Sequence, residues 1–390
     1  MRGLLVGTVI ACGAVALVHG CLVYDGSLLV PREGGAEGGS GEGGADSGDT
    51  CAHLRWPERP AQDDPSGGDV TIYEAVRTLD FGSRDDGGAP PVLGYDLDNT
   101  CTCQGMPPAG ESCKPYGDAS ALHCDLEAGV DNAGLSLVRQ FSAFPGFFQQ
   151  SYINDRLAAG SYGAVVRVAK YNGQLNDTQV EVAFFPSNGT AGIEMGLPSI
   201  PNWDGNDTWT LDPSALVGGV IPDGGDIGAK YIDQSAYVSN GVLVANLGFP
   251  ISIGASQNDN TLTIELVGAI VTARLSKDGS GNWKVDQGTI AGRWPTNKML
   301  TSLQVLHDPF LLNDPNAHLC GSNTTYQLIK TKICTSSDIA VNVLEDGKNA
   351  PCGALTVGID FTSTLAKVGG TFPRTDGGAP CGLQWADSCQ

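Results

Sequence analysis

Acidic and amide side chains at close spacing form the first group of residues in this chain that could do chemistry. The candidate metal ligands are Asp96, Asp98, Asn99, Asp131 and Asn132. Oxygen donors that alternate along a loop suit Ca²⁺, which takes roughly six to eight of them. The run lacks the later Gly and Glu of an EF-hand loop, so it is not an EF-hand. We expect a calcium ion bound here to be structural and not catalytic. Asx turns in solvated loops are the alternative interpretation of the same residues.

Two tryptophans on either side of a short polar loop form the second group. The candidate ligand-binding residues are Trp203, Asp204, Asn206, Asp207 and Trp209. An aromatic ring can cover the apolar face of a sugar while Asp and Asn bond its hydroxyl groups, so this mixture predicts contact with a glycan. The alternative is that the tryptophans pack back onto the core, because buried aromatic surface stabilises a fold strongly.

The motifs of the common catalytic machineries are absent from the sequence. It contains no G-x-S-x-G, no H-E-x-x-H and no P-loop, and no two of its histidines stand four residues apart. A glycosidase needs only two carboxylates at roughly 5 to 10 Å, and 43 acidic residues leave such a pair open. We therefore predict a non-catalytic binding or structural module, with a secreted carbohydrate-active enzyme that uses a carboxylate pair as the alternative.

Ten cysteines downstream of the first 21 residues predict a disulfide framework. They are Cys51, Cys101, Cys103, Cys113, Cys124, Cys320, Cys334, Cys352, Cys381 and Cys389. Five lie early and five late, so complete pairing within one molecule needs at least one bridge between the two groups. Cys320 with Cys334 and Cys381 with Cys389 are the plausible local pairs. A zinc site is disfavoured, since the early C-x-C spacing is not the usual C-x-x-C and no histidine pair stands at ligand spacing.

The first 21 residues have the pattern of an export signal that ends in a lipid-modified cysteine. An apolar run from Leu4 to Val18 follows Arg2 and is short of the roughly 20 residues that span a membrane. The block before Cys21 resembles the bacterial lipobox, although His19 departs from that pattern. The resemblance implies removal of residues 1–20 and acylation of Cys21. An ordinary cleaved signal and an uncleaved anchor are the alternatives.

The anchor and the net charge together predict a location and a set of partners. Leu22 stands where many lipoproteins of the inner membrane carry Asp, so we expect an outer-membrane or cell-surface lipoprotein. A net charge of −21 opposes binding to phosphate backbones, which depends on Lys and Arg, and so argues against nucleic acid. The expected partners are the membrane, through the lipid, and a glycan or a surface protein. Residues 21–50, rich in Gly, are predicted to be a flexible spacer.

Strand patterns fill the middle of the chain and helix patterns follow late. Segments such as Thr261–Ala273 are rich in β-branched residues and are separated by Gly, Asn and Asp turns. This predicts a mostly β fold, a β-sandwich of the jelly-roll or concanavalin-like type, over residues 51–295. Apolar spacing in Asn297–Leu306 and Thr325–Cys334 predicts a small helical, disulfide-bonded appendage over residues 296–390. Asn323 or Thr324 could cap the second helix.

Four Gly- and Asp-rich segments together resemble uncharacterised, cysteine-containing bacterial surface lipoproteins. These segments are Gly94–Cys101, Gly129–Gly134, Gly288–Trp294 and Cys352–Phe361. The resemblance extends over residues 70–370. It implies a location at the cell surface and carries no known activity.

Overall fold

The structure, a computed structural model, describes most of the chain after residue 50. The described residues are 51–65, 68–82, 91–105, 108–117, 122–141, 149–194, 197–223, 226–254, 261–311, 314, 316–373, 380–382 and 385–389. The predicted signal, the lipid-modified Cys21 and the spacer lie outside them and stay predictions. All elements below belong to one compact unit. Within the described residues, no helix is both long enough and apolar enough to cross a membrane.

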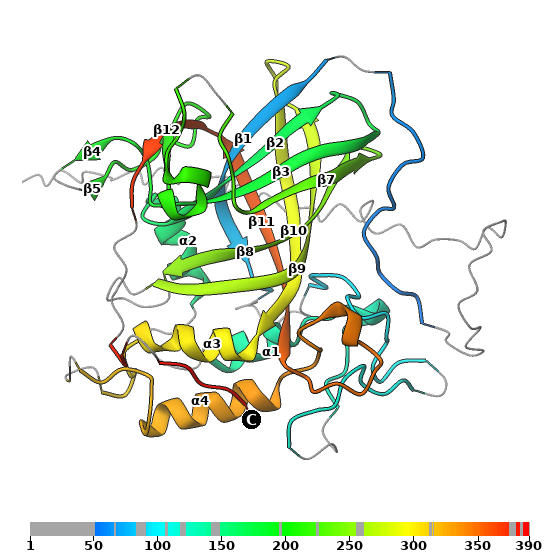
Figure 1. Cartoon of the computed structure of the whole chain (residues 1–390), viewed down its shortest axis with the longest axis vertical. Coiled ribbons are helices and arrows are strands. Elements are labelled where there is room, and N and C mark those ends of the chain that lie inside the picture. Colours follow the sequence, from blue (N-terminus) through cyan, green and yellow to red (C-terminus); the bar gives the residue numbers. More distant parts are fainter. Residues whose placement is uncertain are drawn as a thin grey trace, which may run out of the picture. The chain divides into compact units, whose positions relative to one another are not determined.

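Eight antiparallel strands form a closed barrel (Figure 1). In barrel order they are β1 (Val70–Asp80), β11 (Ala354–Leu365), β10 (Trp283–Pro295), β9 (Thr261–Lys277), β8 (Val242–Gly254), β7 (Ile232–Ser239), β3 (Asp177–Ser187) and β2 (Gly163–Tyr171). Strands β7 to β10 follow one another as a meander. The predicted β-sandwich is therefore wrong, because one sheet closes on itself instead of two sheets packing face to face.

Strand β11 lies between β10 and β1 and so closes the sheet into a barrel instead of a sandwich. It comes from the region predicted to be a helical appendage, yet it pairs with β10 on one side and with β1 on the other. In the second pairing Leu79 lies opposite Phe361. Partners so far apart in the sequence leave no local signal, since strand periodicity shows which face is buried but not which strand lies alongside.

Two pairs of short strands lie outside the barrel. Strand β6 (Thr208–Leu211) pairs in parallel with β12 (Lys367–Thr371), and β4 (Ile193–Glu194) pairs with β5 (Leu197–Pro198). The short 3₁₀ helices are Glu127–Gly129, Pro213–Ala215, Val217–Gly219, Leu303–Val305 and Val343–Glu345.

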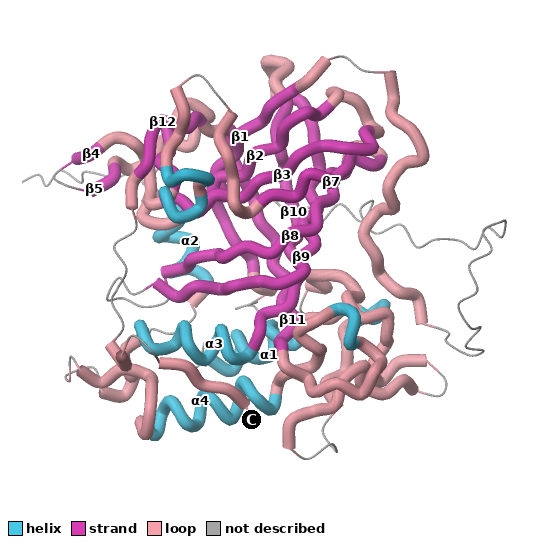
Figure 2. Tube along the Cα trace, viewed as in Figure 1, coloured by secondary structure: helices cyan, strands magenta, loops and turns pink. Residues whose placement is uncertain are grey.

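Of the four α-helices among the described residues, α1, α3 and α4 gather at one end of the barrel (Figure 2). Helices α3 (Thr296–Ser302) and α4 (Thr324–Thr335) confirm the two helices that the sequence predicts. Asn323 caps α4, as expected, by accepting the N–H of Tyr326 at 2.8 Å. Helices α1 (Ala133–Phe141) and α2 (Gln150–Ala158) are additional to the prediction.

The main core fills the barrel and continues between the helices. Val182, Leu243 and Ile359 enter it from three strands, and Leu300 and Ile329 extend it into α3 and α4. Packing of this kind leaves the barrel a filled scaffold and not a channel.

Glu74 of β1 is an ionisable side chain on these buried strands. It is 1% exposed and lies two residues from each of the core residues Ile72 and Val76, on the same face of the strand. Its Oε1 accepts the N–H of Val285 at 3.0 Å, and its Oε2 has no hydrogen-bond partner among the described residues. Burial raises the pKa of this carboxyl to about 7.

All ten predicted cysteines form disulfides. The pairs are Cys51–Cys101, Cys103–Cys124, Cys113–Cys352, Cys320–Cys381 and Cys334–Cys389. The third pair joins the early and the late group, which confirms the parity argument. The two predicted local pairs are wrong. Helix α4 separates Cys320 from Cys334, and ten residues of helix at about 1.5 Å each exceed the roughly 7 Å that a disulfide spans.

Candidate functional site

Helix α1 has one apolar and one polar face, and each face borders a different space. Leu137 and Phe141, one turn apart, are buried in the core. Ser136, Arg139 and Gln140 are exposed on the other face. The same helix therefore borders the protein interior on one face and solvent on the other.

Hydrogen bonds to β11 fix the start of α1. The N–H of Ala133 donates to Oγ1 of Thr356 at 2.9 Å. Asn132 caps the helix through its Oδ1, which accepts the N–H of Leu135 at 3.2 Å. Gly134 permits the close approach, because a Cβ at this position would lie 2.8 Å from the carbonyl oxygen of Thr356. These contacts hold the start of α1 against β11 and so fix the direction in which its polar face points.

A polar cleft of about 530 Å³ lies along the outer face of α1. Its walls are α1 itself, the loop Leu122–Leu126, and the segment Ser336–Asp338 that follows α4. The Cys103–Cys124 disulfide anchors the loop wall. Ionisable groups from all three walls line the cleft, namely His123, Asp125, Arg139 and Asp338. Its size falls within the range of small-molecule sites.

Two carboxyl groups of the cleft hold their protons more tightly than usual. Burial raises the pKa of Asp125 to about 8, although the N–H of Thr102 donates to its Oδ2 at 2.5 Å. Burial also raises the pKa of Asp338 to about 6, while the N–H and Oγ1 of Thr356 donate to its two oxygens. At neutral pH, Asp125 is therefore largely a neutral donor and acceptor, and Asp338 is largely an acceptor.

His123 places a hydrogen-bonded imidazole at the wall of the same cleft. Its Nδ1 lies 3.1 Å from Oε1 of Glu111, and this hydrogen bond is the largest cause of its raised pKa. The main-chain carbonyl of Thr335 acts in the same direction. The Glu111 oxygen also accepts the main-chain N–H of His123 at 2.8 Å, which fixes the loop. These bonds thus hold the imidazole at the wall of the cleft and favour its protonated form.

The cleft can bond a polar ligand from several sides. His123, Arg139, Ser136 and the protonated Asp125 offer donors, and Asp338 offers acceptors. The described lining residues include no Phe, Tyr or Trp. The sequence predictions missed this site, because its residues come from three distant segments, and the only local signal is the Cys124 disulfide beside His123 and Asp125.

Three of the predicted metal ligands do come together. One carboxylate oxygen each from Asp96, Asp98 and Asp131 lie within 4.8 Å of one another. Burial raises the pKa of Asp98, and burial together with Asp98 raises that of Asp131 well above its usual value. His53 is paired with Asp96, and a guanidinium nitrogen of Arg55 lies 3.7 Å from Oδ1 of Asp96.

Protein donors also meet these carboxylates. The N–H of Leu97 donates to Asp131 at 2.6 Å, and the N–H of Thr100 donates to Asp98 at 2.8 Å. Two basic side chains and the loop backbone thus already interact with the oxygens that a cation would need. A structural Ca²⁺ at this group stays a prediction.

The two predicted amide ligands have other roles. Asn99 is exposed, has a φ of 63°, and accepts from Arg55 at 2.5 Å through Oδ1. Asn132 caps α1, and its Nδ2 donates to the carbonyl of Leu93 at 3.1 Å. These bonds support the alternative interpretation of the group, in which Asn and Asp side chains shape loops.

The tryptophan loop is folded onto the protein. Trp209 is 1% exposed, and Trp203 packs against it with ring centroids 5.2 Å apart. The indole N–H of Trp203 donates to the carbonyl of Ala158 at 2.9 Å. A sugar would find little free aromatic surface here, so glycan contact at this loop stays a prediction that the geometry does not favour.

The polar residues of the tryptophan loop are also engaged. Asp207 accepts the main-chain N–H groups of Asn202 and Trp203, at 2.9 and 2.6 Å. Asp204 accepts the N–H of Asn206 at 2.8 Å, and the side chain of Asn206 accepts from Lys367 at 3.1 Å. These bonds close turns within the loop and tie it to β12.

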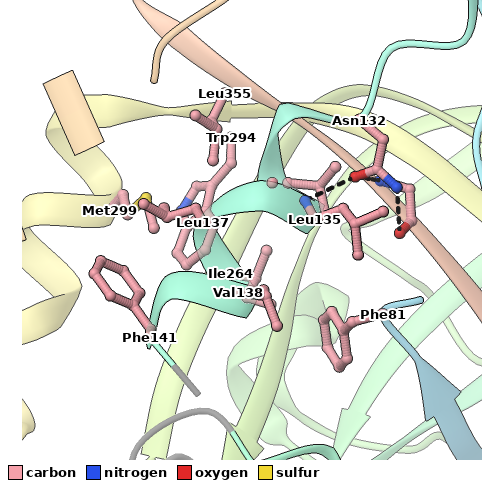
Figure 3. A pocket seen from close by; sticks show the side chains of 13 residues that line it. Phe81, Asn132, Leu135, Leu137, Val138, Phe141, Ile264, Trp294, Met299 and Leu355 are labelled. Atoms are coloured by element: carbon pink, nitrogen blue, oxygen red, sulfur yellow. Dashed lines mark hydrogen bonds between the residues drawn. The ribbon is translucent and has the colours of Figure 1, made fainter. Parts of the chain in front are cut away.

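A small apolar cavity of about 20 Å³ lies on the inner face of α1 (Figure 3). Phe141, Trp294 and Met299 are among the residues that line it. Its volume is about that of one water, and the buried indole N–H of Trp294 has no hydrogen-bond partner among the described residues. This space is too small for an organic ligand, so the outer cleft is the candidate functional site.

Comparisons of this chain with protein-family models, with curated proteins and with solved structures found no match. The chemistry of the cleft is therefore the basis for inferring function.

Proposed function

We propose that this protein is a lipid-anchored, extracytoplasmic binding module whose outer cleft on α1 holds a small hydroxylated ligand, a glycan unit. The observation that carries the proposal is a cleft of about 530 Å³ with donors and acceptors on three separate walls. Sugars offer both donors and acceptors, which match a cleft that mixes a protonated carboxyl, an imidazole and a carboxylate.

The five disulfides support a location outside the cytoplasm, because such bonds persist in oxidising compartments. They agree with the predicted export signal and with acylation of Cys21. Replacing Cys21 by Ser should release the protein from membranes of the native host. Unchanged fractionation of the variant would contradict lipid anchoring. The resemblance to bacterial surface lipoproteins stays a prediction.

The binding proposal is tested with a glycan array, followed by calorimetry on the glycans that bind. Ser136→Trp fills the cleft from the exposed face of α1 and should abolish binding. Ser151→Trp is the matched control, because Ser151 is also an exposed helical serine but lies on α2 and does not line the cleft. Equal binding by both variants, or no binding of any glycan by the wild type, would contradict the proposal.

A carbohydrate-active enzyme is the second candidate, and one observation favours it. Asp125 and Asp338 share a cleft and have unequal pKa values of about 8 and about 6, as an acid and a base require. Both oxygens of Asp338 already accept bonds from Thr356, which is why we prefer a binding role. Hydrolysis of a bound glycan that Asp125→Asn and Asp338→Asn both abolish would establish the enzyme instead.

A further inference from the structure

Two histidines that do not line the cleft face each other across a short antiparallel bridge. His307 pairs with His318. Main-chain hydrogen bonds flank the pair: the N–H of Asp308 donates to the carbonyl of Ala317 at 2.7 Å, and the N–H of Leu319 donates to the carbonyl of Leu306 at 3.0 Å. This makes the two histidines a non-hydrogen-bonded pair, the type that brings side chains closest together. Their ring centroids lie 4.3 Å apart with an angle of 35° between the planes.

Two buried polar atoms lack a partner, one on His318 and one on Gln304, a residue whose main-chain carbonyl faces the His318 ring. They are Nδ1 of His318 and Oε1 of Gln304, and neither has a hydrogen bond to any described residue. The main-chain carbonyls of Gln304 and Leu306 face the His318 ring, while burial and the nearby His307 lower its pKa. The ring is therefore neutral at pH 7 and carries a free lone pair on one nitrogen. Leaving such acceptors buried and unpaired is costly.

We propose that His307 and His318, with Oε1 of Gln304, bind a late divalent transition metal, with Cu²⁺ preferred over Ni²⁺ and Zn²⁺. Neutral imidazole is a good ligand for all three ions, and Cu²⁺ stands highest in the general order of affinities. Metal–nitrogen bonds of about 2.0–2.1 Å place two bound nitrogens roughly 3 Å apart. Rings whose centroids are 4.3 Å apart are close enough for one nitrogen of each to reach that spacing once the rings turn out of their stacked orientation.

Neighbouring groups make this a site of nitrogen and amide oxygen. The Asp308 carboxylate accepts the N–H of Phe310 and the side chain of Asn323, both at 2.9 Å. Cys320 is bonded to Cys381 and offers no thiolate. With two protein nitrogens and one oxygen as ligands, the remaining positions of the metal would hold water.

Calorimetry tests the site on the full chain, purified without a histidine tag. One equivalent of Cu²⁺ should bind, Ca²⁺ should not bind there, and both His307→Ala and His318→Ala should weaken Cu²⁺ binding at least tenfold. His307→Gln and His318→Gln repeat the test with more conservative side chains, and thermal unfolding confirms that each variant folds. His123→Ala, a histidine in the cleft, is the control and should bind Cu²⁺ normally.

Nitrogen couplings from two imidazoles should also be present in the electron paramagnetic resonance spectrum of the Cu²⁺ complex. The proposal is overturned if Cu²⁺ does not bind, if folded variants of both histidines bind it as the wild type does, or if His123→Ala removes it equally.

Discussion

The two faces of helix α1 perform different tasks within one turn of each other. On the inner face Phe141 packs into the core beside a cavity of about 20 Å³. On the outer face Ser136 and Arg139 border a polar cleft of about 530 Å³. The contrast suggests that the inner face supplies stability and the outer face supplies binding. Substitutions on the two faces should therefore change different measurements.

The inner face should show the largest effect on stability. Phe141→Ala removes a ring that is 1% exposed, and such truncations cost about 3–5 kcal/mol of unfolding free energy. Chemical denaturation followed by tryptophan fluorescence measures this loss. The fraction that remains folded should bind ligand with wild-type affinity, and a loss of affinity without a loss of stability would contradict the division.

Glu74 is a titratable group buried in the interior, the region that supplies stability. Its folded pKa of about 7 lies above the ordinary 4.5, so the folded protein holds a proton that the unfolded chain releases. The free energy of unfolding should thus fall as pH rises from 4.5 to 7, by about 3 kcal/mol in total.

Glu74→Gln should flatten this dependence on pH, measured as unfolding free energy across the same range. Glu265→Gln, at a half-exposed glutamate on β9, is the control and should keep the wild-type slope. If Glu74→Gln also keeps that slope, Glu74 does not titrate in the way its burial implies.

The Cys113–Cys352 disulfide links the segment that contains Glu111, the partner of His123, to the residues just before β11. Replacing both cysteines by Ser should cost about 2–5 kcal/mol of stability, the usual effect of removing a native disulfide, and at the upper end of that range because the bridge closes a loop of 239 residues. It should also weaken ligand binding, since Glu111, which holds His123, lies two residues from Cys113. The matched double variant of Cys320 and Cys381 should lose stability but keep ligand affinity.

The outer face should show the smallest effect on stability. Arg139→Ala, at an exposed position, should change the unfolding free energy by no more than about 0.5 kcal/mol. It should weaken the affinity for a bound glycan by about tenfold, because one charge-assisted hydrogen bond to the glycan is lost. Calorimetry and denaturation on the same preparation measure both, and a variant that is unstable but binds normally would reverse the assignment.

Features with a local signal could be predicted from the sequence. The strand of Thr261–Ala273 and the Asn323 cap follow from periodicity and from helix-start chemistry, and parity alone predicts a disulfide between the two cysteine groups. The barrel could not be predicted, because its closure depends on β1 and β11, strands near opposite ends of the chain.

The site shows the same limit on sequence-based prediction. Asp96, Asp98 and Asp131 were predicted as a group, since two of them share one short loop, and they do come together. Asp125 and Asp338 share the cleft only because the Cys103–Cys124 loop and the segment after α4 fold against α1. Neither residue has a spacing that distinguishes it from the other acids of the chain.

Mapping the ligand-induced changes in backbone amide resonances is the most direct test of the central claim that the outer face of α1 is the binding site. The probe is a panel of simple mono- and disaccharides titrated to millimolar concentration. The account predicts shifts confined to Leu122–Leu126, Ser136–Gln140 and Ser336–Asp338. Shifts at Trp203–Trp209 instead, or none with any sugar, would contradict it.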